Sequence, residues 1–161
     1  MDLGLIRIDY LKHHQSCIPR LADLFWQEWQ QFYEATGRTA EQVTAYMRAK
    51  ANTDSIPLAL VAVYRSQVIG TGAIKPHDLD IRPQFSPWLA GLYVLREFRD
   101  NGVGSLLVAR LLEEARQLGL SELYLWTPSA ERLYSRLGWS LLERTQYCDQ
   151  WISIMKKELN R

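Results

Sequence analysis

The segment most suited to binding a ligand is a glycine-containing turn at residues 96–104, REFRDNGVG, which runs directly into an amphipathic stretch. Gly102 and Gly104 remove side chains where the backbone enters the predicted helix. A helix N-terminus carries about half a positive charge and several unpaired N–H donors, which suits a phosphate or diphosphate. Arg96 and Arg99 add positive charge nearby. The turn therefore predicts an anion site, with simple steric relief at the helix start as the alternative.

Two better-known phosphate-binding motifs are absent. The pattern GxxxxGK[ST] needs a lysine that follows neither glycine here, and Leu107 stands where GxGxxG would place its third glycine. The stretch from Val94 to Gly102 is also longer than the tight turn of a dinucleotide-binding unit. The predicted anion site is thus of another type.

The histidines and cysteines form no metal-binding or nucleophilic pattern. His13 and His14 are adjacent, and on a strand they would face opposite sides, so we expect no metal site. Cys17 and Cys148 are too few for a disulfide framework or a zinc ligand set and fit a reducing compartment. Cys148 is a conceivable nucleophile, but no histidine lies near it in the sequence.

Length and charge limit the function classes. The chain has 161 residues, which predicts a single domain over residues 1–161. Its 19 Lys and Arg nearly balance 18 Asp and Glu, which argues against a nucleic-acid partner. Neither a secretory leader nor an apolar stretch of membrane-spanning length is evident, so we expect a cytoplasmic protein with no membrane partner.

The first half of the chain predicts one strand, two successive helices and a β-hairpin. Residues 3–11 alternate like a strand, and Pro19 begins a helix that ends at Gly37. Thr39 and Gln42 form a capping box for a second helix. A hairpin around residues 65–67 and a proline-rich surface loop at residues 76–87 follow. The apolar stripes expected on the two helices are Leu21, Leu24, Phe25, Trp29 and Phe32, then Val43, Tyr46 and Met47.

The second half places the glycine turn between two strands. A strand at residues 88–94 precedes it, and the helix after it carries an apolar stripe that begins at Val103 and Leu107. A strand at residues 121–127 comes next, so these two strands should be parallel neighbours joined by a right-handed crossover. A short helix at residues 129–138 and two C-terminal strands complete a mixed sheet of α/β or α+β class with helices on its faces.

Two motifs in the second half carry a resemblance to a known family. RxxGxG at residues 99–104 follows a strand, and AERLYSRLGW at residues 130–139 comes later. In this order and separation they resemble the motifs of the GNAT superfamily of acyl-CoA-dependent N-acetyltransferases. Arg96 replaces the usual proline and Asp100 the usual first glycine.

The resemblance implies a mostly antiparallel mixed sheet whose two central parallel strands splay apart, with helices on both faces. It implies acetyl-CoA as co-substrate, with the diphosphate on the amides of the turn and the pantetheine arm along the preceding strand. Gly91 is the expected bulge in that strand. The cofactor-binding residues expected on this basis are Leu92, Tyr93, Val94, Arg99, Asp100, Asn101, Gly102, Val103, Gly104, Ser105, Thr127 and Tyr134.

Tyr134 matches the family tyrosine that stands near the sulfur and is often assigned as the general acid, so it is the expected catalytic residue. A core tyrosine on a short helix is the alternative. Thr127 falls where many relatives have an asparagine that contacts the cofactor, and a helix N-cap explains it equally well.

The general base is left open by the sequence. Several relatives use a glutamate on the strand that holds the pantetheine, but residues 88–93 contain no carboxylate. A water chain ending at backbone carbonyls is one alternative, and the side-chain candidates are Glu28, His77, Asp78, Asp80 and Asp149.

The expected function is transfer of an acetyl group from acetyl-CoA to a primary amine of a small molecule or peptide by direct attack. An acyl-CoA sensor without turnover and an interaction domain of the same fold are the alternatives. Relatives commonly dimerise through the C-terminal strands, which leaves a homodimer open. The aromatic residues weighed as either core or acceptor pocket, with core preferred, are Trp26, Trp29, Phe32 and Trp88.

Overall fold

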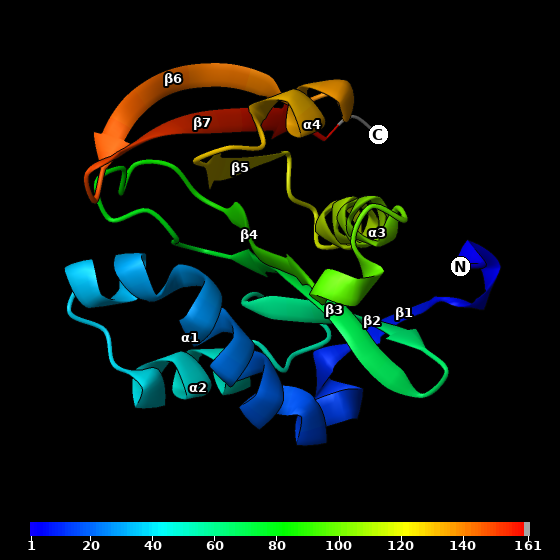
Figure 1. Ribbon diagram of the computed structural model, residues 1–161. Helices are drawn as coiled ribbons and strands as arrows, with labels where there is room; N and C mark the ends of the chain where they lie inside the picture. Colours follow the sequence, from blue (N-terminus) through cyan, green and yellow to red (C-terminus); the bar gives the residue numbers. More distant parts are fainter. Residues whose placement is uncertain (160–161) are drawn as a thin grey trace.

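The computed structural model describes residues 1–159 and shows one seven-stranded sheet with helices on both faces (Figure 1). The strand order is β1-β2-β3-β4-β5-β7-β6. The elements are η1 (Leu3–Leu5), β1 (Arg7–Tyr10), η2 (Leu11–Cys17), α1 (Ile18–Ala35), α2 (Ala40–Ala49), β2 (Leu58–Tyr64), β3 (Gln67–Lys75), β4 (Trp88–Val94), η3 (Arg96–Phe98), α3 (Val103–Gln117), β5 (Glu122–Thr127), α4 (Glu131–Arg136), β6 (Ser140–Tyr147) and β7 (Gln150–Glu158), where η denotes a 3₁₀ helix.

The sheet has the mixed character that the sequence predicts. Every neighbouring pair is antiparallel except β4 and β5, which are parallel. These two strands share a single register pair, Trp88 with Tyr124, and one bond from the Tyr124 N–H to the Pro87 carbonyl at 3.0 Å. Beyond that point β4 pairs only with β3 and β5 only with β7. The expected splaying of the central strands is confirmed.

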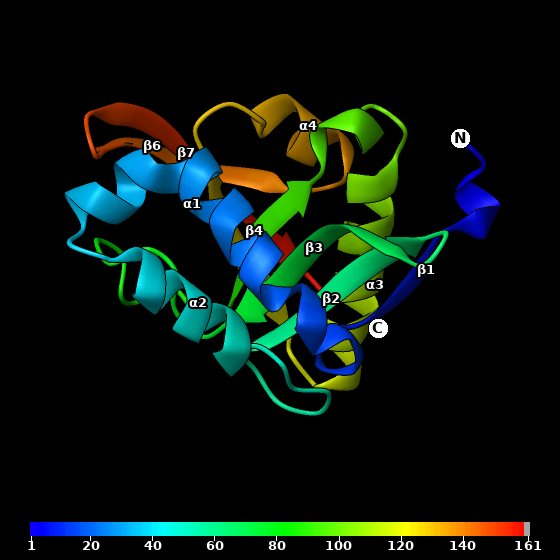
Figure 2. The same cartoon turned by 60° about the horizontal axis from the view of Figure 1, so that its bottom comes forward.

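Strand β2 shows how the sheet separates two cores. Its side chains alternate in direction, as strand geometry requires. Leu58, Leu60 and Ala62 enter the cluster that packs against α3. Ala59, Val61 and Val63 enter the cluster that packs against α1 and α2. Figure 2 shows α1 and α2 together on one side of the sheet, with α3 behind it.

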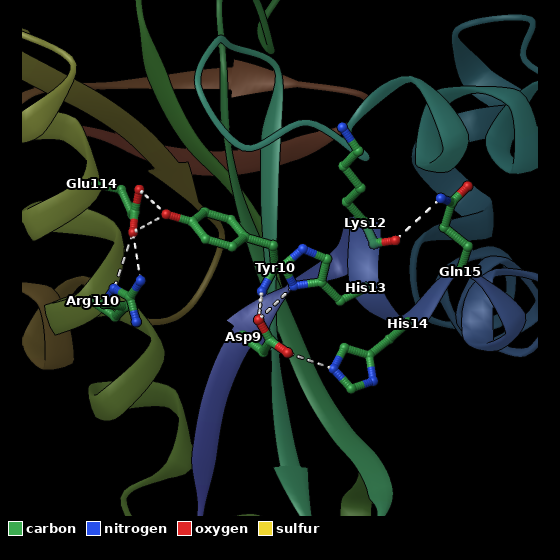
Figure 3. Close-up of polar contacts among 8 residues, drawn as sticks. All are labelled: Asp9, Tyr10, Lys12, His13, His14, Gln15, Arg110 and Glu114. Atoms are coloured by element: carbon green, nitrogen blue, oxygen red, sulfur yellow. Dashed lines mark hydrogen bonds and ion pairs between the residues drawn. The ribbon is translucent and has the colours of Figure 1, made fainter.

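A buried polar contact fixes α3 against β1 (Figure 3). The Tyr10 hydroxyl lies 2.9 and 3.0 Å from the two carboxylate oxygens of Glu114, and the Arg110 guanidinium donates to the same carboxylate at 2.7 Å. Glu114 is 2% exposed. A carboxylate this deeply buried needs such partners, so the contact locks the helix whose N-terminus forms the predicted anion site.

The N-terminal segment differs from the prediction. Strand pairing is limited to Arg7–Tyr10, because residues 3–5 form a 3₁₀ turn in which the Asp2 carboxylate accepts the Gly4 N–H. His13 and His14 lie in η2 rather than on a strand, and both contact the Asp9 carboxylate, at 3.0 and 2.9 Å (Figure 3). Burial raises the pKa of Asp9, but the hydrogen bonds from His14, His13 and the Tyr10 N–H outweigh it and hold that pKa at about 2.

The predicted helices form with two differences. The capping box of Thr39 and Gln42 is present, but Tyr46 is 42% exposed and lies outside the apolar face that Val43 and Met47 form. Helix α1 leaves helical dihedral angles at Trp29 (φ −119°, ψ 22°) and continues beyond this kink to Ala35. None of the helices in residues 1–159 combines the length and hydropathy needed to cross a bilayer.

Candidate active site

A β-bulge at Gly91 shapes the open edge of β4. Thr71 on β3 faces Tyr93, whereas Ala73 faces Ala90, so Gly91 and Leu92 together oppose one residue of β3. Gly91 has φ +61°, a conformation that side chains other than glycine rarely adopt. A bulge bends the strand and increases its twist, which turns the second half of β4 away from β5.

The second half of β4 directs backbone groups into the space between the two strands. The Leu95 N–H donates to the Ile69 carbonyl on β3 at 2.9 Å, so the alternation of a strand turns the polar groups of Val94 away from β3. Leu92, two residues earlier, has the same orientation. Tyr93 pairs with Thr71 and packs its ring against Trp29. Of the residues expected to contact the cofactor, Tyr93 is therefore the least able to reach this space.

A cavity of about 1080 Å³ occupies the space between β4 and β5 and extends to both faces of the sheet. Its walls come from segments far apart in the sequence. On one face they include Phe25 and Trp29 of α1 and Lys50 at the end of α2, and on the other Tyr134 of α4. The kinked end of α1 reaches the β6–β7 turn, where the Gln150 side chain donates to Gln31 at 2.8 Å.

The start of α3 has the geometry of an anion site. Asp100 and Gly102 have φ values of +62° and +87°, so Asp100 adopts the conformation that the glycine of the family motif would adopt. The first-turn amides of Val103, Gly104 and Ser105 have no acceptor within the helix. The Asn101 side chain is occupied locally, since it donates to the Arg99 carbonyl at 2.8 Å. The turn itself lies outside the set of residues that line the cavity.

Arg99 turns toward β4 rather than outward from the turn. Its Nε donates to the Val94 carbonyl at 2.8 Å, and its guanidinium lies 5.2 Å from the centre of the Tyr93 ring. A long ion pair of 3.9 Å joins it to Glu28 on α1. Arg99 thus braces the end of β4, while the Val94 carbonyl keeps a second lone pair for another donor.

Tyr134 lines the cavity with a free hydroxyl. The side chain is 7% exposed, and no residue of the part of the chain that the structure describes forms a hydrogen bond with its oxygen. Burial raises the pKa of Tyr134 to about 12. The hydroxyl therefore keeps its proton at any physiological pH and is available as a donor to a group in the cavity.

Thr127 serves the local backbone. Its hydroxyl accepts the N–H groups of Ser129 and Ala130 at 3.3 and 3.0 Å, just before α4 begins. This contact fits the capping alternative, although Thr127 also lines the cavity.

The base candidates from the sequence are unequally placed. Glu28, His77, Asp78 and Asp80 line the cavity, and Asp149 does not. Asp78 is engaged on both oxygens, by Lys75 at 3.1 Å and by the Trp126 indole N–H at 2.9 Å. His77 and Asp80 are exposed.

The aromatic residues divide between core and cavity. Trp88 is fully buried and belongs to the core, as expected. Trp26 does not line the cavity and stacks on Tyr33 at 5.7 Å. Trp29 and Phe32 line it, and Trp29 also packs against the core cluster beneath α1, so it has both of the roles that the sequence left open. Both residues lie in the part of α1 that begins at the kink.

Lys50 is a residue of the cavity that the sequence did not single out. It is 6% exposed, and its ammonium nitrogen lies 5.1 Å from the centre of the Phe25 ring. Burial and, second, the charge of Lys75 lower the pKa of Lys50, Asp78 opposes both, and the resulting pKa is about 7. The only sequence signal is a lysine directly before a turn, which is typical of solvent-exposed helix ends.

Parted parallel strands, a bulge beside the gap and a helix start with free amides define the fold class of acyl-CoA-dependent acetyltransferases. The family model described as acetyltransferase (GNAT) family matches residues 18–139. The chain belongs to this family.

Relatives agree with that assignment. An uncharacterized N-acetyltransferase of Chlorobaculum tepidum is 30% identical over 87 residues, which are 54% of this chain and 52% of that protein. The match thus spans about half the length of this curated relative.

Solved structures share the fold at low identity. The aminoglycoside 6'-N-acetyltransferase from Enterococcus faecium is 18% identical with a TM-score of 0.72, covering 96% of this chain and 98% of that one. The structure of yncA from Salmonella typhimurium with its cofactor acetyl-CoA is 17% identical with a TM-score of 0.72, covering 97% and 95%.

Proposed function

We propose that the protein is an N-acetyltransferase that moves an acetyl group from acetyl-CoA to a primary amine of a small molecule or peptide by direct attack. One observation carries the proposal: a single cavity passes between β4 and β5, with Tyr134 on one face of the sheet and the pocket under α1 and α2 on the other. Acetyl-CoA supplies an activated acetyl group and a thiol leaving group. Two reactants that enter from opposite faces can meet in such a passage.

The chain offers a place for each part of acetyl-CoA. The free amides of Val103, Gly104 and Ser105 at the start of α3 suit the diphosphate. The backbone groups of Leu92 and Val94 face the gap and can add a peptide-like arm as a short extra strand. The Leu92 N–H is then suited to polarise the thioester carbonyl.

Tyr134 is proposed to donate to the departing sulfur. With a pKa of about 12 it holds its proton until the carbon–sulfur bond breaks. Outright transfer to a thiolate, whose conjugate acid has a pKa of about 8.5 in water, is uphill by about 5 kcal/mol. Burial in the same cavity raises the pKa of the thiol as well and narrows this gap. Tyr134 therefore acts by donating a hydrogen bond that strengthens as negative charge develops on the sulfur.

The acceptor side of the cavity combines aromatic side chains with charged ones of both signs. Trp29, Phe32 and Trp126 provide apolar surface, Glu28 and Asp80 provide negative charge, and Arg38 and Lys75 line the same cavity. These features suit a primary amine with an apolar or ring-shaped body. The Enterococcus faecium neighbour is named for aminoglycosides, which makes that class a reasonable first probe.

The test is thiol release from acetyl-CoA in the presence of kanamycin, spermidine, glutamate and a short peptide with a free N-terminus. The proposal predicts acceptor-dependent release by at least one of them. Binding of CoA by calorimetry with no release from any amine would indicate a sensor instead. No binding heat up to millimolar CoA would indicate an interaction domain without a CoA site.

A further inference from the structure

Lys50 differs from the other lysine and arginine residues of the described chain in its burial. Its side chain is 94% buried, since only 6% is exposed, and no residue within 1–159 forms a hydrogen bond or an ion pair with its nitrogen. The nitrogen sits over the Phe25 ring and lies 3.6 Å from the point where a Cβ of Gly91 would stand. It therefore borders the bulge, one residue from the Leu92 amide.

The proposed reaction needs a proton acceptor at this place. A primary amine has a pKa of about 10.4 and is mostly protonated at neutral pH, so it must lose a proton before it attacks. The strand beside the thioester offers no carboxylate. Asp78 already binds Lys75 and Trp126, and Glu28 lies 3.9 Å from Arg99. Within the described residues, Lys50 is the titratable side chain that borders the bulge without a polar partner.

We propose that the Nζ of Lys50 is the general base that takes a proton from the acceptor ammonium, an inference that rests on the proposed acetyltransferase function. The neutral Lys50 amine takes one proton, and the acceptor nitrogen then bonds to the acetyl carbon. The carbon–sulfur bond breaks with its electron pair on sulfur. The second proton of the nitrogen passes to the thiolate, to which the Tyr134 hydroxyl donates a hydrogen bond, and Lys50 releases its proton to solvent. One proton leaves per acetyl group transferred.

The surroundings of Lys50 support this role. The titratable groups that line the cavity on the elements around it are Glu28 and Tyr33 of α1, Arg38 between α1 and α2, Tyr46 of α2, Lys75 of β3, and His77, Asp78 and Asp80 of the following loop. Burial first, and Lys75 second, lower the pKa of Lys50 to about 7, while Asp78 raises it. About half of the amine is then neutral at pH 7, and it is a base about 10²–10³-fold stronger than an ordinary carboxylate. A second cation arriving in the pocket favours the neutral form further.

The experiment compares wild type with Lys50→Met, Lys50→Arg and the exposed control Lys12→Met, using the amine of the panel that wild type acetylates fastest. We expect kcat at pH 7 to fall about 10²-fold or more in both Lys50 variants, with the CoA dissociation constant unchanged. Lys50→Arg should not restore kcat, because the arginine guanidinium stays protonated. The wild-type rate should level off above about pH 7, whereas the variant rates should keep rising with pH. The side-chain resonances of labelled lysine in the CoA-bound protein report the protonation of Lys50 directly.

Two results would overturn the inference while leaving the acetyltransferase function intact. One is a Lys50 resonance that stays protonated to about pH 9. The other is recovery of activity in Lys50→Arg with a raised acceptor KM in Lys50→Met, which would make Lys50 an anchor for an anionic group of the acceptor. If wild type acetylates no amine of the panel, the proposed function fails and this inference fails with it.

Discussion

Lys50→Met should stabilise the protein at neutral pH. The lysine amine is held in a buried position without a polar partner among residues 1–159, and its pKa there is about 7 instead of 10.5. A difference of this size corresponds, at about 1.36 kcal/mol per pH unit, to about 5 kcal/mol of folding free energy at pH 6 and below. Methionine fills a similar volume without a charge, so most of this cost should vanish.

The pH dependence gives the prediction its sign. The folded-state pKa of Lys50 is lower than the unfolded-state pKa, so the unfolded chain binds more protons between pH 7 and pH 10.5. Wild-type stability should therefore rise with pH across that window. The advantage of Lys50→Met should shrink from about 5 kcal/mol at pH 6 to about 2 kcal/mol at pH 9, with both figures as upper bounds.

The assay is urea unfolding of wild type, Lys50→Met and Lys12→Met at pH 6, 7, 8 and 9, with equal m-values as the check on two-state behaviour. Lys12 is exposed, so its replacement should change stability by no more than about 0.5 kcal/mol at each pH. A Lys50→Met variant that is no more stable than wild type, or an advantage independent of pH, would show that the amine is solvated. If Lys50→Met is more stable than wild type but inactive, then Lys50 lowers the stability of the fold and is needed for activity.

Three further substitutions address the other parts of the site. Tyr134→Phe should lower kcat about 10²-fold with little change in the CoA dissociation constant, and an equal loss of both in steady-state kinetics and calorimetry would count against a donor role. Gly102→Val should cost about 1–3 kcal/mol in unfolding because of its φ of +87°, and should weaken CoA binding; unaltered affinity in the folded variant would contradict the diphosphate assignment. Glu114→Ala should cost about 3 kcal/mol, against less than about 1 kcal/mol for the exposed neighbour in Glu113→Ala, and equal losses in urea unfolding would refute the anchoring of α3 to β1.

Local patterns were sufficient to predict the parts of the fold that local interactions determine. The capping box of Thr39, the hairpin between β2 and β3 and the helix after Gly102 all form where the sequence placed them. The bulge at Gly91 was expected from the family resemblance, and glycine inside a strand often marks a bulge.

Tertiary packing decides the features that the sequence did not predict. Lys50 follows a helix of modest amphipathicity, and only the approach of α1 and of Gly91 buries it. From the kink at Trp29 onward, part of the apparent core stripe lines the cavity, and no proline or glycine marks the kink. Arg99, expected beside the anion site from its charge and from the family motif, also donates to the carbonyl of Val94 at the end of β4, a contact that no local pattern indicates.

A crystal structure of the protein with acetyl-CoA tests the account at its centre. We predict diphosphate oxygens within hydrogen-bond distance of the backbone nitrogens of Val103 and Gly104, the pantetheine arm between β4 and β5, and the sulfur within reach of the Tyr134 hydroxyl. Electron density for the ligand at another surface, with the gap between β4 and β5 closed by side chains, would contradict it.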